Sequence, residues 1–288
     1  MSHQTRPARY LARLLLLTIG LPVCGLANPS EILPGWRELS FEQSSAWATA
    51  RSRISLVARN DDRLGAVWVL RAEESIADNS ARETQQMTPG NGHLLRRSRL
   101  SSGKSTRLKE YQYGMDGVVR IRREPDSSTR LPPDQWPVSS RREIAYPAIE
   151  QGAVLTSMHA LLMLAGRVID APGQAATAYV HGDVNFYRVR LAVVGEERVA
   201  VDYSLIGGKE RITGERPAIV VRLQVEPVGA PQGDPEFSLL GLSGVVSILL
   251  DQQSRLPLAV RGRAPMIGQT QINLVAAEIG PPHAEPLP

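Results

Sequence analysis

Hydrophobic and polar residues alternate with a period of two along most of the chain, which predicts β-strands. In residues 54–72 two alternating segments flank Asn60-Asp61-Asp62, which is typical of a hairpin. We expect further strands at 93–100, 106–113, 117–122, 176–180, 185–194, 198–205, 217–225, 243–250, 258–263 and 269–276. Turn residues separate these segments at hairpin intervals, so the pattern predicts about ten to twelve antiparallel strands.

A helical period replaces the alternation at residues 152–165, where apolar side chains recur at i, i+3 and i+4. A shorter helix is expected at 40–50. A sheet of ten to twelve strands tends to curl or close. The sequence therefore predicts a mainly β fold: a curved antiparallel sheet or half-open β-barrel, with one main amphipathic helix on its concave face.

Five prolines in residues 124–147 predict a long connection without a continuous strand or helix. This connection would join two halves, 48–123 and 148–279, of a single β-rich domain spanning 28–279. The proline-rich residues 280–288 are expected to form a disordered tail.

The first 27 residues have the pattern of a cleavable signal peptide. Three arginines precede an apolar stretch at 14–23, and the small residues Gly25 and Ala27 form a cleavage signal. The stretch is about half of the roughly 20 residues that a membrane-spanning helix needs. We therefore expect export to the periplasm. A lipid anchor through Cys24 is the alternative, although Val23 before it fits that signal poorly.

Charge and cysteine content exclude several classes of function. The chain of 288 residues has a formal net charge of +4, but three arginines lie in the leader, so the exported part would be almost neutral. The charge thus does not predict nucleic-acid binding. Cys24 is the only cysteine and would leave with the leader, which excludes disulfides, thiol catalysis and thiolate zinc sites.

No catalytic motif stands out, so we expect a non-enzymatic protein without a metal or cofactor. His93, His159 and His181 lack the spacing of a zinc site, and we expect His159 on the polar face of the helix to be solvated or capped, not catalytic. The segment 241–244 lacks the second glycine of a nucleophile elbow. Gly207-Gly208-Lys209 is interpreted as a hairpin turn.

The C-terminal half resembles a known class of exported proteins. Its ending runs from Ile248-Leu249-Leu250-Asp251 through a turn at Ser254 to Leu256-Pro257-Leu258, and a closing strand follows Gly268. Over residues 153–277 this layout resembles an uncharacterised family of exported bacterial proteins known only as a domain of unknown function. It is more distantly similar to periplasmic lipoprotein carriers, which implies a half-open barrel around a cavity for acyl chains. Turn chemistry also explains Asp251 and Pro257 without a ligand.

Basic residues are concentrated in one part of the chain, between His93 and Glu143, where twelve face six acidic residues. Basic residues near an anionic lipid surface contribute about 1 kcal/mol each. The candidates for contact with an anionic envelope surface are Arg96, Arg97, Arg99, Arg120 and Arg122. A solvated strand face is the alternative interpretation. The candidates for lining a ligand cavity are Trp68, Leu155, Met158, Leu162 and Tyr187, each of which would also suit a plain core.

Together these patterns predict a periplasmic binding protein for a lipid or lipoprotein in cell-envelope biogenesis. Two alternatives stay open: an interaction scaffold without a ligand cavity, and a hydrolase acting on glycan or lipid. A large apolar space between the helix and the sheet would favour the carrier, and close packing there would favour the scaffold.

Overall fold

The computed structural model describes residues 34–44, 49–126, 130–150, 152–233, 237–265 and 267–283. These residues form a mainly β fold with a single 15-stranded sheet, as the alternation predicted, although with more strands. The strands are β1 (Trp36–Ser44), β2 (Thr49–Asp61), β3 (Gly65–Ile76), β4 (Asn79–Met87), β5 (Leu94–Ser102), β6 (Arg107–Tyr113), β7 (Gly117–Arg123), β8 (Val138–Ala145), β9 (Leu155–Thr156), β10 (Ala175–His181), β11 (Phe186–Leu205), β12 (Arg211–Val228), β13 (Ser243–Asp251), β14 (Pro257–Ala264) and β15 (Gly268–Ile279). The helical elements are α1 (Leu161–Val168) and the 3-10 turns η1 (Pro133–Gln135) and η2 (Pro172–Gln174).

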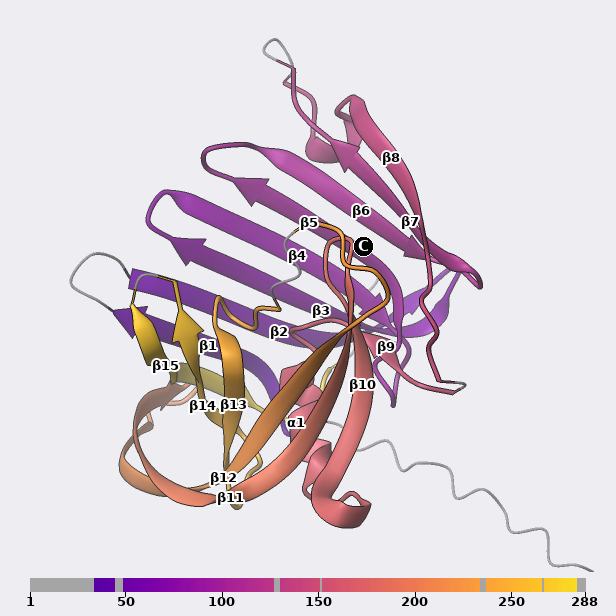
Figure 1. The fold of residues 1–288 in the computed structure, drawn as a ribbon. Helices are drawn as coiled ribbons and strands as arrows, with labels where there is room; N and C mark the ends of the chain where they lie inside the picture. Colours follow the sequence, from indigo (N-terminus) through magenta and orange to yellow (C-terminus); the bar gives the residue numbers. More distant parts are fainter. Residues whose placement is uncertain are drawn as a thin grey trace, which may run out of the picture. The chain divides into compact units, whose positions relative to one another are not determined.

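Two meanders make up this sheet and meet at the β1–β15 pair. Strands β1 to β8 run outward to one edge, and β9 to β15 run back from the opposite edge (Figure 1). The two edges approach each other through side chains. Tyr111, Val118 and Ile144 of β6–β8 cluster with Tyr179 and Phe186 of β10 and β11. The sheet therefore curls into a partial ring that has an inner face.

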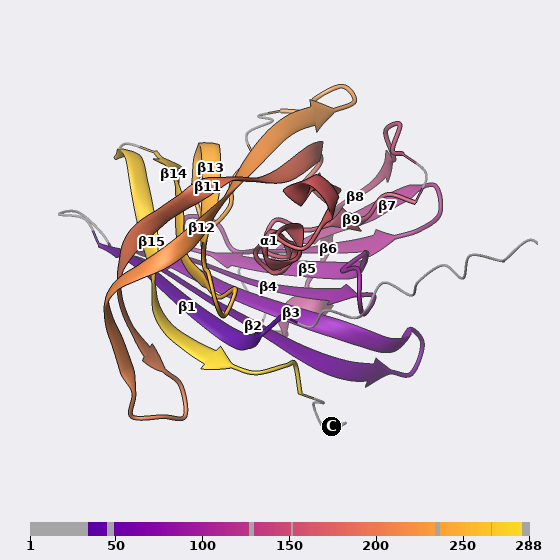
Figure 2. The same cartoon turned by 90° about the horizontal axis from the view of Figure 1, so that it is seen from below.

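The helix is shorter than the apolar stripe predicted. Gly152 has a φ of 78°, and Leu155–Thr156 pair with β10 as strand β9, so the chain is not helical there. The Ser157 hydroxyl then accepts the N–H of Ala160 at 3.2 Å within the turn that precedes the helix. Helix α1 consequently begins at Leu161 and lies within the curve of the sheet (Figure 2).

Three other predictions about local structure were wrong. Residues 36–44 form β1 instead of entering a helix at 40, because Leu39 and Phe41 turn to the core with a period of two. Residues 138–145 form β8, since the prolines of that region flank the strand and do not interrupt it. Residues 281–283 are held in place: Pro281 accepts a hydrogen bond from Arg37, and His283 accepts one from Ala58. The predicted leader, 1–27, lies outside the described residues.

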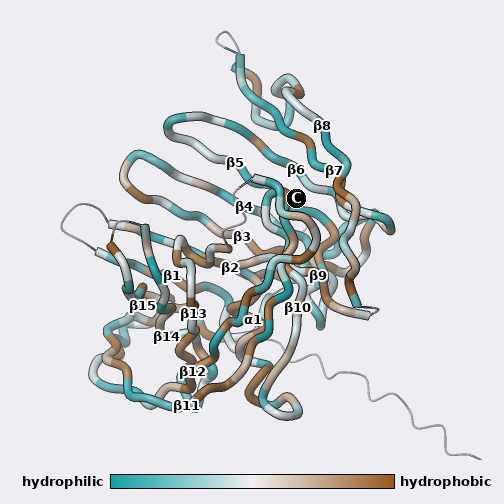
Figure 3. Tube along the Cα trace, viewed as in Figure 1, coloured by the Kyte–Doolittle hydropathy of each residue, from teal (hydrophilic) through white to brown (hydrophobic). Residues whose placement is uncertain are grey.

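The main hydrophobic core fills the curve around α1 and takes side chains from the C-terminal meander and from β1–β5. Leu161, Leu162, Ala165 and Val168 of α1 are buried there, and α1 packs against β11 and β13. Figure 3 shows hydrophobic residues gathered along α1 and β11–β14, whereas β4–β7 carry many hydrophilic residues. The inner face is thus apolar in one half and polar in the other.

Candidate functional site

Seven basic side chains share the inner face of β5–β8. Register explains this arrangement, because residues directly opposite each other in an antiparallel pair project from the same face. Arg99 lies opposite Lys109, and Lys109 lies opposite Arg122. Tyr111 lies opposite both Arg97 and Arg120. The full set, called the cationic face below, is Arg97, Arg99, Arg107, Lys109, Arg120, Arg122 and Arg142.

Two adjoining cavities open over this face. The first has a volume of about 500 Å³ and lies over the turns that follow β3 and β5, with residues 238–241 as its other wall. The second, of about 480 Å³, lies between β5–β6 and the turn that precedes β11. Both volumes are typical of small-molecule sites. The residues common to both linings are Arg99, Ser101, Arg107, Met158 and Ser238. The two cavities therefore form one continuous groove, called the cationic groove below.

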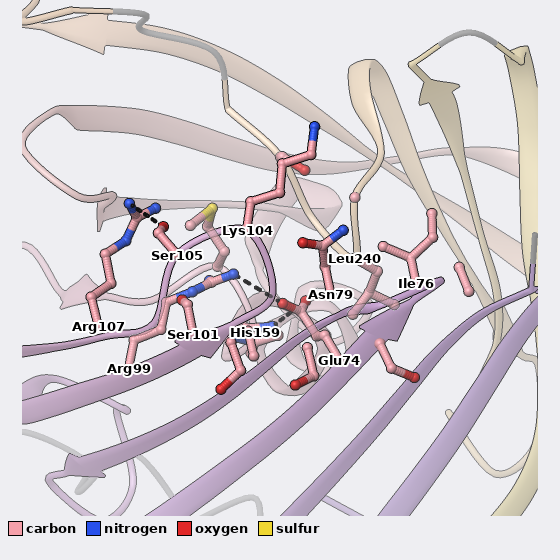
Figure 4. Close-up of a pocket in the computed structure, with 18 residues that line it drawn as sticks. Glu74, Ile76, Asn79, Arg99, Ser101, Lys104, Ser105, Arg107, His159 and Leu240 are labelled. Carbon is pink, nitrogen blue, oxygen red and sulfur yellow. Dashed lines mark hydrogen bonds and ion pairs between the residues drawn. The ribbon is translucent and has the colours of Figure 1, made fainter. Parts of the chain in front are cut away.

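Gly103 brings together the turns that form the first cavity. Its φ is 138°, and a Cβ at this position would lie 2.2 Å from Oδ1 of Asn79. Glycine thus allows the β5–β6 turn to approach the β3–β4 turn closely. Both Asn79 and the β5–β6 turn residue Lys104 line the cavity (Figure 4).

A buried ion cluster forms the floor between the two cavities. His159 Nε2 lies 3.1 Å from Oε1 of Glu74, and its Nδ1 lies 3.6 Å from Oε1 of Glu83. The Arg99 guanidinium reaches both carboxylates at 3.3 Å, and Figure 4 shows its contact with Glu74. Gln85 donates to Glu83 at 2.6 Å and accepts from Ser157. The two acidic residues of the cluster are thus balanced by two basic residues, His159 and Arg99. The neutral side chain of Gln85 also holds Glu83 by a hydrogen bond.

Protonation of His159 follows from these contacts. Burial disfavours the charged ring, but the hydrogen bonds and charges of Glu74 and Glu83 outweigh it and raise the pKa of His159 to about 9. Burial likewise disfavours the Glu83 carboxylate, yet His159 and Arg97 hold the Glu83 pKa far below its usual value. At neutral pH the cluster therefore holds an imidazolium between carboxylates. Of the two expectations for His159, solvation was wrong, since its side chain is 4% exposed and hydrogen-bonded to Glu74.

We expect this cluster to limit stability at both ends of the pH range. A raised His159 pKa contributes stability that is complete below the unfolded value of about 6.5 and is lost as pH rises through about 9. The depressed Glu83 pKa contributes stability that is complete above the unfolded value of about 4.5 and falls below it. Urea midpoints measured across the pH range should thus be highest near pH 5–6. In Glu74→Gln the alkaline decline should move to lower pH, and an unmoved decline would contradict this assignment.

A second polar cluster closes the other end of the groove. Arg97 is buried; it donates to the carbonyl oxygens of His181 (2.6 Å) and Gly182, and its guanidinium stacks 4.0 Å from the Tyr111 ring. Asp183 accepts from Lys109 and Tyr111, both at 2.5 Å. Arg120 Nε also lies 2.9 Å from Asp183. Burial opposes ionisation of Asp183, but these partners lower its pKa to about 2.

The proposed anionic-surface residues do not form one exposed patch. Arg97, Arg99, Arg120 and Arg122 project from the inner face, while Arg96 alternates to the outer face opposite Gln112. Arg97 and Arg120 are already engaged in the cluster around Asp183. The five arginines therefore face a groove and a strand exterior, not a single outer surface.

The cavity candidates are divided in a similar way. Met158 lines both cavities, and Tyr187 lines the second. Trp68 and Leu162 lie in the main core, and Leu155 lies in the smaller cluster where the two edges of the sheet approach each other. Sequence reasoning missed the roles of Glu74, Glu83 and Asp183. The signal for the groove was the i, i+2 spacing of Arg97 with Arg99 and of Arg107 with Lys109.

Comparisons with known proteins assign no function to this fold. No protein-family model matches the chain, and no curated protein is detectably similar. One solved structure, the crystal structure of a beta-barrel-like protein of domain of unknown function DUF1849 from Brucella abortus, is similar with a TM-score of 0.45 and 8% sequence identity. The match covers 86% of this chain and 98% of that one. Within the described residues, no helix is long and apolar enough to cross a membrane.

Proposed function

We propose that this chain is an exported, non-enzymatic binding protein that holds the anionic head of a lipid or lipoprotein of the cell envelope in its cationic groove. The proposal rests on the excess of positive charge among the residues that line the groove. Its lysines and arginines are Arg97, Arg99, Lys104, Arg107 and Lys109. Its carboxylates are Glu74, Glu83 and Asp183, and His159 adds a further positive charge. A groove with this excess of positive charge attracts anions.

Apolar side chains around the first cavity support an amphiphilic ligand. Met158, Leu240 and Ile76 line it together with the cations, and Ile76 is 51% exposed. An acyl chain gains about 0.8 kcal/mol for each methylene that it buries. The space between α1 and the sheet is filled by the core side chains of the helix. The ligand is therefore assigned to the groove and not to the concave space behind α1.

We expect Lys104→Glu/Arg107→Glu to weaken binding to phosphatidylglycerol vesicles at least tenfold, because both residues line the groove, each basic residue near such a surface contributes about 1 kcal/mol, and reversal adds repulsion. Sedimentation with vesicles at low salt measures this binding. Arg63→Glu/Lys209→Glu is the matched control, since it changes the net charge equally at exposed turns distant in sequence. Equal binding by the two double variants would contradict the proposal. Organic extraction of protein purified without detergent should also release lipid.

Export is tested separately from binding. Cell fractions from a strain that expresses the full chain should contain the mature protein in the periplasm, with Asn28 as its first residue by N-terminal sequencing. A mature chain found in the cytosol would contradict the periplasmic assignment. A form that begins at a lipidated Cys24 would replace the proposed cleavage after Ala27 with an anchor.

A scaffold role is the second candidate, and two observations favour it. The first is the close packing between α1 and the sheet, which is the packing expected of a scaffold. The second is an exposed sheet edge. Strand β8 forms an edge of the sheet, and most of its residues are exposed. Such an edge presents unpaired backbone donors and acceptors that can add a strand from a partner. Photo-crosslinking from Ser140 in cells should then recover one discrete envelope protein, and a lack of any crosslink would count against this role.

A further inference from the structure

We infer that the first cavity takes a phosphorylated sugar, an assignment that specifies the ligand class of the groove proposed above and rests on that function. The first cavity differs from the second in its chemistry. The second contains the tightly paired Asp183 cluster. The first contains Lys104, shares Arg107 with the second, and has six serine hydroxyl groups in its lining.

Two cations of the first cavity are free of carboxylates. Among the described residues, neither Lys104 nor Arg107 forms an ion pair, while the neighbouring Arg99 is shared between Glu74 and Glu83. Arg107 donates to the Ser105 hydroxyl at 3.3 Å (Figure 4), and its Nε is buried with no hydrogen-bond partner in the part of the chain that the structure describes. Lys104 is exposed at the rim of the cavity. A ligand with two negative charges would neutralise these two cations.

The remaining polar lining suits a polyol. The neutral side chains are Ser75, Asn79, Ser80, Ser101, Ser102, Ser105 and Ser238, and Glu74 is the single carboxylate among the described lining residues. A serine hydroxyl both donates and accepts, as does each hydroxyl of a sugar, so such a wall can pair with many of them at once. At about 500 Å³ the cavity has room for more than an isolated phosphate group.

A phosphate monoester fits the charge better than a carboxylate does. It carries about −1.5 to −2 charges at pH 7 and three terminal oxygens, against one charge for a carboxylate. A guanidinium can donate two parallel hydrogen bonds to these oxygens, and an ammonium can act as a point charge beside them. The Arg107–Ser105 pair supplies the fixed donors, and Lys104 can approach from the rim. The same chemistry occurs in a free sugar phosphate and in the headgroup of a phosphorylated glycolipid.

Isothermal titration of the full mature chain with glucose 1-phosphate, glucose and inorganic phosphate tests the assignment. We expect glucose 1-phosphate to bind at least tenfold more tightly than either of the other two. Lys104→Gln/Arg107→Gln should lose at least tenfold of that affinity. Lys209→Gln/Arg63→Gln, which removes the same charge from exposed turns, should retain it. Thermal melting of each variant checks that it is folded.

The source of the phosphate is distinguished by vesicles of phosphatidylcholine that contain monophosphoryl lipid A. Binding of these vesicles that falls in Lys104→Gln/Arg107→Gln supports a glycolipid headgroup. Binding of glucose 1-phosphate without binding of any vesicle supports a free sugar phosphate and overturns the lipid function instead. If phosphatidylglycerol vesicles bind but glucose 1-phosphate does not, or if the double variant binds it as the wild type does, the sugar-phosphate assignment is overturned and the proposed function stands.

Discussion

Replacing His159 with leucine should lower the free energy of unfolding by about 3–5 kcal/mol, the usual cost of removing one partner from a buried ion cluster. The ring is held between Glu74 and Glu83, and the Glu83 side chain is only 5% exposed. Leucine fills the space but leaves these two carboxylates with Arg99 as their ion-pair partner and Arg97 as a further positive charge near Glu83. Urea denaturation at pH 7 measures the loss.

The double variant His159→Leu/Glu74→Gln is the control for this prediction. It removes one carboxylate together with the imidazolium and leaves Glu83 paired with Arg99, so it should recover a large part of the lost stability. Recovery is expected because the damage in the single variant comes from an uncompensated carboxylate and not from packing. A double variant that is less stable than His159→Leu would show that the cluster is stabilised mainly by hydrogen bonds that glutamine cannot replace.

The pattern of apolar residues along the chain was enough to predict the strands of the apolar half of the fold. Strands such as β13 and β14 have long runs of buried apolar side chains, and their predicted limits agree with the structure within two residues. The segments expected at 185–194 and 198–205 are one long strand, β11, because a bulge at Gly195 lets the chain continue where a turn was expected. Local pattern cannot distinguish a bulge from a turn when both use glycine.

The polar half was much harder to predict, and strand β4 shows why. Its inward side chains include Glu83 and Gln85, which are buried although neither residue is apolar. Hydrophobic alternation detects strands whose inner face is apolar, so a strand that presents ion-cluster residues to the interior has no such signal. The partners of these residues come from β5 and from the turn before α1, at long sequence separation. Hydrophobic alternation therefore could not predict the groove, for the same reason that it could not predict β4.

We expect Leu162→Ala to lower the free energy of unfolding by about 2–5 kcal/mol, the range for truncation of a fully buried leucine. Leu162 is 1% exposed and packs in the main core under the curved sheet. A side chain that lined a space for acyl chains would have few protein contacts to lose, and its truncation would cost much less. The measurement therefore tests directly whether the interior behind α1 is packed protein or a ligand space.

Leu164→Ala on the same helix is the matched control, because Leu164 is only partly buried and should lose less than half as much stability. Both variants should bind phosphatidylglycerol vesicles as the wild type does, since neither Leu162 nor Leu164 lines the cationic groove. The opposite result, a small loss of stability with a large loss of lipid binding in Leu162→Ala, would place the acyl chain behind α1. That outcome would assign the binding site to the interior and not to the groove. Truncation of a leucine that packs against protein lowers stability, whereas truncation of a leucine that contacts a ligand lowers binding.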